Sequence, residues 1–114
     1  MSNKTKEIIN DINSTFNELN KYAPDYNKAF QKYVYESEKE GSLPIKIKEL
    51  IALALSIQAQ CSFCIVGHTK NAIEAGATCQ ELIEVGMVAG LLGGGRVLCY
   101  LKYLFDTIKE LGLK

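Results

Sequence analysis

Residues 49–68 read ELIALALSIQAQCSFCIVGH, and this stretch does most to decide the fold. Residues 50–57 are apolar at almost every position, which predicts a helix buried on several sides rather than one lying on the surface. Pro44, just before it, is typical of a helix start. A second helical pattern begins after Cys61 and Ser62 and ends at Gly76, so we expect two helices separated by a break near Gln60.

Helical periodicity continues on both sides of this stretch and predicts six helices and no strand. After Pro24, aromatic side chains recur at helical spacing, and we expect this stripe to pack in the core. Thr78 and Glu81 form a capping box at another helix start, and the glycines at 93–95 separate that helix from a last amphipathic one. The first two stripes are Ile8, Ile9, Ile12, Phe16 and Leu19, then Tyr26, Phe30, Tyr33 and Val34. We therefore expect a single all-α domain over residues 1–114.

The composition is that of a globular protein with balanced charge. Its 114 residues include 13 basic and 13 acidic side chains. A net charge of zero argues against nucleic acid as a partner, because proteins that bind it concentrate Lys and Arg. Residues 1–9 lack the apolar core of a secretory signal, and no apolar stretch reaches the roughly 18 residues of a membrane span. We therefore expect a cytoplasmic protein with no membrane partner. In the reducing cytoplasm, a close cysteine pair is typical of catalytic, redox or metal chemistry.

The segment CSFCIVGH, residues 61–68, places two thiols and the single histidine of the chain at helical spacing. At about 100° per residue, Cys61, Cys64 and His68 project from one arc roughly 60° wide. A helix start and an adjacent imidazole both favour the thiolate, which is the nucleophilic form of cysteine. The arrangement therefore suits reversible thiol chemistry.

Two other interpretations of these three residues stay open. Cys61, Cys64 and His68 could bind zinc, although tetrahedral zinc needs a fourth ligand and the sequence has no second paired spacing. Alternatively, the thiols could be small buried hydrophobic groups and His68 a hydrogen-bonded core residue. For Cys79 and Cys99, which are isolated in separate helices, we expect inert burial.

From Glu49 through CSFCIVGH to NAIEAGATCQELIEV, residues 71–85, the chain resembles the carboxymuconolactone decarboxylase and alkylhydroperoxidase D-like family. The resemblance implies an alkylhydroperoxidase D-like helical domain with a family core at about residues 24–111, assembled as a homo-oligomer. It also implies a relay of Glu49, Cys61, Cys64 and His68. Peroxidase members carry a further histidine between the two cysteines, and this chain has Phe63 there.

Glu49 enters this relay through the resemblance alone. Twelve residues along a straight helix would rotate it about 120° away from Cys61, so only a break near Gln60 and the packing of two helices could bring it to the thiols. The alternative is a solvated acid near a helix start.

The resemblance implies an oxidoreductase, a thiol-dependent peroxidase or disulfide reductase. Cys64, with His68 as base, would attack a hydroperoxide and become a sulfenic acid, and Cys61 would then close a disulfide. A thioredoxin-like or dihydrolipoyl-bearing protein would reduce it, and no cofactor or metal is implied. Helix-end reasoning alone would instead make Cys61 the more acidic thiol. Two alternatives remain: a lactone decarboxylase using His68 and Glu49 for proton transfer, and a metal-binding or redox-sensing protein without turnover.

Overall fold

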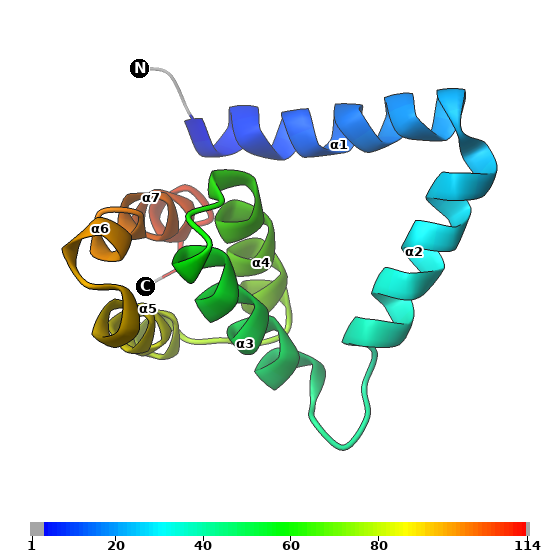
Figure 1. Cartoon of the computed structure of the whole chain (residues 1–114). Coiled ribbons are helices and arrows are strands. Elements are labelled where there is room, and N and C mark those ends of the chain that lie inside the picture. The colour runs from blue at the N-terminus through cyan, green and yellow to red at the C-terminus, as the bar shows by residue number, and fades with distance from the viewer. Residues whose placement is uncertain (1–3, 114) are drawn as a thin grey trace.

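The computed structural model describes residues 4–113, and every regular element in that range is a helix, as expected for an all-α protein (Figure 1). Six helices are ten residues or longer, and a four-residue helix, α6, stands before the last one. The helices are α1 (Lys4–Tyr22), α2 (Pro24–Glu38), α3 (Ile45–Gln58), α4 (Ser62–Glu74), α5 (Cys79–Gly93), α6 (Gly95–Leu98) and α7 (Leu101–Glu110). None of the helices described is long and apolar enough to cross a membrane.

The break between α3 and α4 occurs where the sequence predicts it. Gln60 has a φ of 57°, in the left-handed region that ends a helix. The backbone N–H of Cys61 donates to the carbonyl of Ser56 (3.2 Å), which ties the turn to the end of α3. The side chain of Gln60 also accepts a hydrogen bond from Arg96 in α6. The turn lets α4 fold back and pack along α3.

The core lies among α3, α4, α5 and α7. Its fully buried large side chains include Leu53, Ile57, Ile65, Leu82 and Leu104. α5 begins with the predicted capping box, and Gly94 ends it with a φ of 72°.

Two glycines on α5 let neighbouring chain segments approach it closely. A Cβ on Gly86 would lie 2.8 Å from Leu101, and one on Gly90 would lie 2.9 Å from Leu98 Cγ. Both glycines therefore serve packing within the chain.

α1 and α2 form an arm that projects from this core (Figure 1). Phe16 of α1 stacks on Phe30 of α2 with ring centroids 5.8 Å apart. α1 contacts α4 and α7, whereas α2 meets α3 over a small area. The prediction that the aromatic stripe of α2 is core was therefore wrong: Tyr26 is 67% exposed and Tyr33 is 71% exposed. Helical spacing identifies a stripe, but α1 covers it only at Phe30 and leaves the tyrosines exposed.

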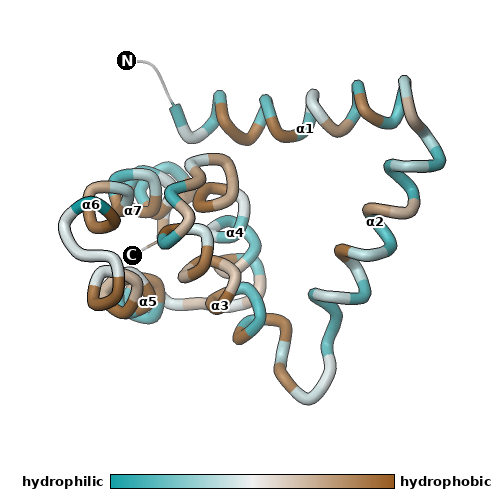
Figure 2. The backbone as a smooth tube through the Cα atoms, in the orientation of Figure 1, coloured by the Kyte–Doolittle hydropathy of each residue, from teal (hydrophilic) through white to brown (hydrophobic). Residues whose placement is uncertain are grey.

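The apolar helix α3 is also less enclosed than expected. Ile51 and Leu55 are exposed, and Figure 2 shows apolar chain along α3 and α5. A shallow apolar groove runs between these two helices. It is lined by Ile47, Leu50, Ile51, Ala54, Glu81, Glu84, Val85 and Val88. We call this surface the α3–α5 groove.

Candidate functional site

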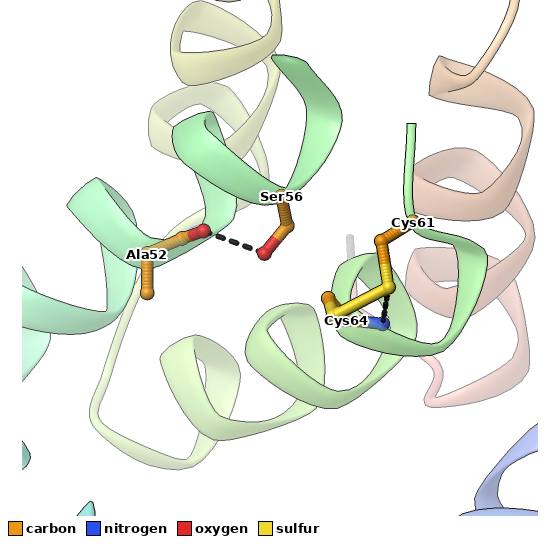
Figure 3. Close-up of a disulfide and its surroundings, with 4 residues drawn as sticks. All are labelled: Ala52, Ser56, Cys61 and Cys64. Carbon is orange, nitrogen blue, oxygen red and sulfur yellow. Dashed lines mark hydrogen bonds between the residues drawn. A yellow bond between two sulfur atoms is a disulfide. The ribbon is translucent and has the colours of Figure 1, made fainter. Parts of the chain in front are cut away.

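Cys61 and Cys64 form a disulfide at the start of α4, beside the last turn of α3 (Figure 3). Their Cα atoms are 5.3 Å apart. Cys61 is the N-cap of α4, and its sulfur accepts the backbone N–H of Cys64 at 3.2 Å. Cys64 is exposed, whereas Cys61 is half-buried. The pair thus joins an exposed cysteine to a half-buried one at the helix end.

His68 lies one helical turn beyond Cys64 and is held by Glu49 of α3. Nδ1 of His68 is 2.7 Å from Oε1 of Glu49. Glu49 is only 3% exposed, so it is not a solvated acid. The break at Gln60 and the packing of α3 on α4 bring the carboxylate to the imidazole, although the two residues are 19 positions apart. With Nδ1 donating to Glu49, the Nε2 nitrogen is left to accept a proton.

The structure adds one residue that the sequence did not single out. Glu38, at the end of α2, places Oε2 3.7 Å from Nδ1 of His68. Nothing in local spacing relates it to the motif, because it lies in a charged run on a different helix. Only the way α2 leads into α3 brings it to the site.

The three groups change one another's ionisation. The hydrogen bond to Glu49, opposed by burial, raises the pKa of His68 above its ordinary value. Burial works to raise the pKa of Glu49, but hydrogen bonds to His68 and Glu38 outweigh it and hold that pKa below the usual range. The hydrogen bond with Glu49, followed by burial and the charge of Glu49, raises the pKa of Glu38 to about 7. Near neutral pH, Glu49 is therefore a carboxylate facing a readily protonated imidazole.

These directions predict that the free energy of unfolding falls as the pH rises from 5.5 to 8.5. Raised pKa values mean that the folded protein holds protons on His68 and Glu38 more tightly than the unfolded chain does. His68 stabilises the fold fully below its unfolded pKa near 6.5, and this stabilisation is lost as the pH rises through the folded pKa. The carboxyl of Glu38 becomes unfavourable between its unfolded pKa of about 4.5 and its folded pKa of about 7. The lowered pKa of Glu49 has the opposite effect on the free energy of unfolding. Its contribution stabilises the folded protein at higher pH and is lost as the pH falls through that lowered pKa.

Urea titrations of the oxidised protein should therefore give a free energy of unfolding about 2 kcal/mol lower at pH 8.5 than at pH 5.5, allowing for partial solvation of Glu38. Glu38→Gln should lose most of this dependence. Stability that stays flat or rises with pH would contradict the assignment.

The same three residues are also the candidate metal ligands that lie together in this site. Among residues 4–113, the group of three candidate ligands within 4.8 Å of one another is Glu38, Glu49 and His68. It contains neither Cys61 nor Cys64, because both sulfurs are engaged in the disulfide. Because Glu49 is hydrogen-bonded to both His68 (2.7 Å) and Glu38, we interpret the three groups as a hydrogen-bonded triad.

The remaining candidate positions lie outside the triad. Phe63, between the two cysteines, is exposed. Cys79 begins α5 and packs against the core, in line with an inert role. Cys99 is exposed, so the prediction that it is buried was wrong. It lies in the turn after α6, where the short helix leaves it on the outside.

Residues 24–100 match the family model described as the carboxymuconolactone decarboxylase family. An uncharacterized protein of Cupriavidus necator is 37% identical over 95 residues, which cover 83% of this chain and 84% of that protein. An uncharacterized protein from the cox locus of Paracoccus denitrificans is 32% identical over 72 residues, or 63% of this chain and 65% of that protein.

Two solved structures have the same fold. The apo form of a carboxymuconolactone decarboxylase family protein from Legionella pneumophila has a TM-score of 0.90 and 33% identity, covering 96% of this chain and 97% of its own. A Thermotoga maritima protein of that family, with a possible part in the antioxidative response, has a TM-score of 0.81 and 25% identity. That match covers 93% of this chain and 90% of the other.

Proposed function

Because this chain belongs to the carboxymuconolactone decarboxylase family, we propose that it is a thiol-dependent peroxidase of the alkylhydroperoxidase D-like type. The observation that supports this most directly is the Cys61–Cys64 disulfide at the start of α4, one turn from an imidazole bonded to a buried carboxylate. A nucleophile, a base and a group that orients the base are the parts of an activated thiol. Simple lactone decarboxylation needs no cysteine pair.

The reaction begins from the reduced protein. His68 takes the proton of the Cys64 thiol, and the thiolate attacks the outer oxygen of a hydroperoxide. The O–O bond breaks, Cys64 becomes a sulfenic acid, and the departing alkoxide takes the proton back from His68. The Cys61 thiol then attacks the Cys64 sulfur, forming the disulfide and releasing water. A dithiol reductant restores both thiols and is itself oxidised to a disulfide.

Exposure supports Cys64 as the attacking atom, because a hydroperoxide can reach it from solvent. Glu49 stabilises the imidazolium that forms when His68 takes the proton, since the carboxylate lies 2.7 Å from Nδ1. We assign the reductant to the class of thioredoxin-like or dihydrolipoyl-bearing proteins, whose dithiols can attack the exposed sulfur.

The proposal is tested by following tert-butyl hydroperoxide and free thiols together. One equivalent of peroxide should remove two of the four thiols of the reduced chain, and dihydrolipoamide should restore them. A Cys99→Ser chain, which lacks the exposed cysteine outside the site, should also lose two thiols. Loss of four thiols, or of none, would rule out the cycle. Turnover of a lactone by a Cys61→Ser and Cys64→Ser double variant would instead favour a decarboxylase that uses only Glu49 and His68.

We also propose that the chain assembles with copies of itself. Its accessible surface is 7340 Å², whereas a compact monomer of this mass exposes about 6,200 Å². The excess is comparable to the roughly 800 Å² that one partner buries in an interface of standard size. A second copy would cover the α3–α5 groove and the exposed apolar side chains of α5 beside it. Among these side chains, Leu91 is 81% exposed.

Light scattering on the eluting protein should therefore give a mass that is a multiple of 12.6 kDa. Ile51→Lys, an exposed change in the α3 wall of the groove, should lower that mass, because burying a lysine against an apolar partner is costly. Lys28→Glu, an exposed change on α2, is the matched control and should leave the mass unchanged. A monomeric wild-type chain would refute the assembly.

A further inference from the structure

Glu38 brings a third ionisable group to the Glu49–His68 pair. Its Oε2 is 3.7 Å from Nδ1 of His68, and the three groups offer atoms that all lie within 4.8 Å of one another. The side chain of Glu38 is 30% exposed, whereas that of Glu49 is almost completely buried. Two carboxyls and one imidazole from three different helices thus share one small volume.

Lys48 holds the end of α2 where Glu38 lies close to Glu49 and His68. Its Nζ donates to the carbonyl oxygens of Ser37 (3.1 Å) and Lys39 (2.7 Å), the residues on either side of Glu38. The last carbonyls of a helix lack partners within it and attract positive charge, so Lys48 caps the end of α2. Lys48 also directly precedes Glu49 in α3. One lysine therefore holds the end of α2, with Glu38, beside Glu49.

The charges of the three groups favour a proton shared between Glu38 and Glu49. With both carboxyls ionised and His68 protonated, the negative charge of Glu38 would face that of the buried Glu49. A proton between Glu38 and Glu49 removes this repulsion and leaves one ion pair, Glu49 with His68. With its pKa raised to about 7, Glu38 keeps this proton at a pH where an ordinary carboxyl has already lost it.

Other charges near Glu38 do not replace these two partners. On α2 itself, Glu36 pairs with Lys39 at 2.7 Å. α1 meets α2 at the stacked rings of Phe16 and Phe30, eight residues before Glu38. Lys48 of α3 is engaged with the backbone of α2. Glu49 and His68 are the ionisable groups that act on Glu38.

We propose that Glu38 is a positioning residue of the thiol relay, which shares a proton with Glu49, orients Glu49 towards His68 and sets how tightly His68 holds its own proton. This role rests on the proposed function, because His68 acts through the proton that it takes from Cys64. When Glu38 releases its proton to solvent, a second negative charge faces Nδ1, and His68 binds its proton more tightly. Phe63, between the cysteines, has no proton to contribute.

The coupling between Glu38 and His68 can be measured without substrate. The sequence has one histidine, so the imidazole of His68 gives a single set of NMR signals in the oxidised protein. Glu38→Gln should lower the pKa of His68, because an amide cannot ionise. Lys48→Met leaves Glu38 intact but frees the end of α2, and it should shift this pKa in the same direction. Glu36→Gln is the matched control on the same helix and should leave it unchanged.

An unchanged or raised His68 pKa in Glu38→Gln would overturn the proposal. Stoichiometric binding of Zn²⁺ that moves the His68 signals and is lost in Glu38→Gln would also overturn it, because the three groups would then be metal ligands.

The second measurement is the pH profile of tert-butyl hydroperoxide reduction with dihydrolipoamide as the reductant. The wild-type profile should contain an ionisation near pH 7 that Glu38→Gln loses and Glu38→Asp restores. At pH 7, kcat of Glu38→Gln should fall about tenfold with little change in KM, since binding of the peroxide is not affected. A profile unchanged in Glu38→Gln would contradict the role. If the wild-type chain reduces no peroxide, the proposed function fails, and the NMR comparison still decides whether Glu38 controls His68.

Discussion

Replacing Cys64 by serine should reduce peroxide turnover by about 10³-fold or more, because a hydroxyl at neutral pH is a far weaker nucleophile than a thiolate. Serine has nearly the volume of cysteine, and position 64 is exposed, so the fold should be retained. The measurement is the rate of tert-butyl hydroperoxide consumption with dihydrolipoamide in excess. Cys99→Ser, which removes an exposed thiol outside the site, should keep full activity.

The Cys61→Ser variant determines which sulfur attacks. If Cys64 reacts first, this variant still forms the sulfenic acid but cannot resolve it, and a 1,3-diketone probe should label Cys64. The Cys64→Ser variant should then show no labelling after one equivalent of peroxide. Labelling of Cys61 in Cys64→Ser, with none in Cys61→Ser, would reverse the assigned order. That reversal would agree with the position of Cys61 at the helix end, where its sulfur accepts a backbone N–H.

The variant Glu49→Gln should lower kcat for peroxide reduction by about 10²- to 10⁴-fold, the range expected when the orienting carboxylate of a catalytic base is lost. Gln keeps the shape of the side chain but removes the charge that stabilises protonated His68. The pKa of His68 should therefore fall, and NMR on its single imidazole measures this directly. Losing a buried charge-assisted hydrogen bond should also cost about 2 kcal/mol of stability, so turnover is measured well below the unfolding temperature.

Glu74→Gln is the matched control for this variant. Glu74 is an exposed acid of α4 that pairs with Lys70, one turn away on the same helix, so kcat and the His68 pKa should stay as in the wild type. Full turnover by Glu49→Gln would remove Glu49 from the relay. A decarboxylase mechanism would also lose activity here, so this variant is read together with Cys64→Ser, which a decarboxylase would tolerate.

Local sequence determined the helices, their ends and the contents of the motif. Periodicity predicted the all-α fold, and the capping box at Thr78 and the breaks near Gln60 and the glycines at 93–95 were confirmed. These features depend on residues within a few positions of one another, which is the range over which a helix forms its bonds. The same short-range geometry predicted one face for Cys61, Cys64 and His68; Cys64 and His68 do lie one turn apart in α4, whereas Cys61 is its extended N-cap. The sequence also supplied the family, through the motif and its surroundings.

The tertiary structure decided which of these faces are covered and which distant groups meet. The aromatic stripe of α2 has helical spacing like any core stripe, but its tyrosines are exposed because α2 packs on little besides α1. On a straight helix Glu49 would point away from the motif. The left-handed turn at Gln60 instead folds α4 back along α3, which places Glu49 beside His68. Glu38 carried no signal at all: Lys48 caps α2 and holds Glu38 there. Periodicity orders side chains around one helix axis, whereas contacts between helices depend on the turns that join them and on the side chains that hold their ends together.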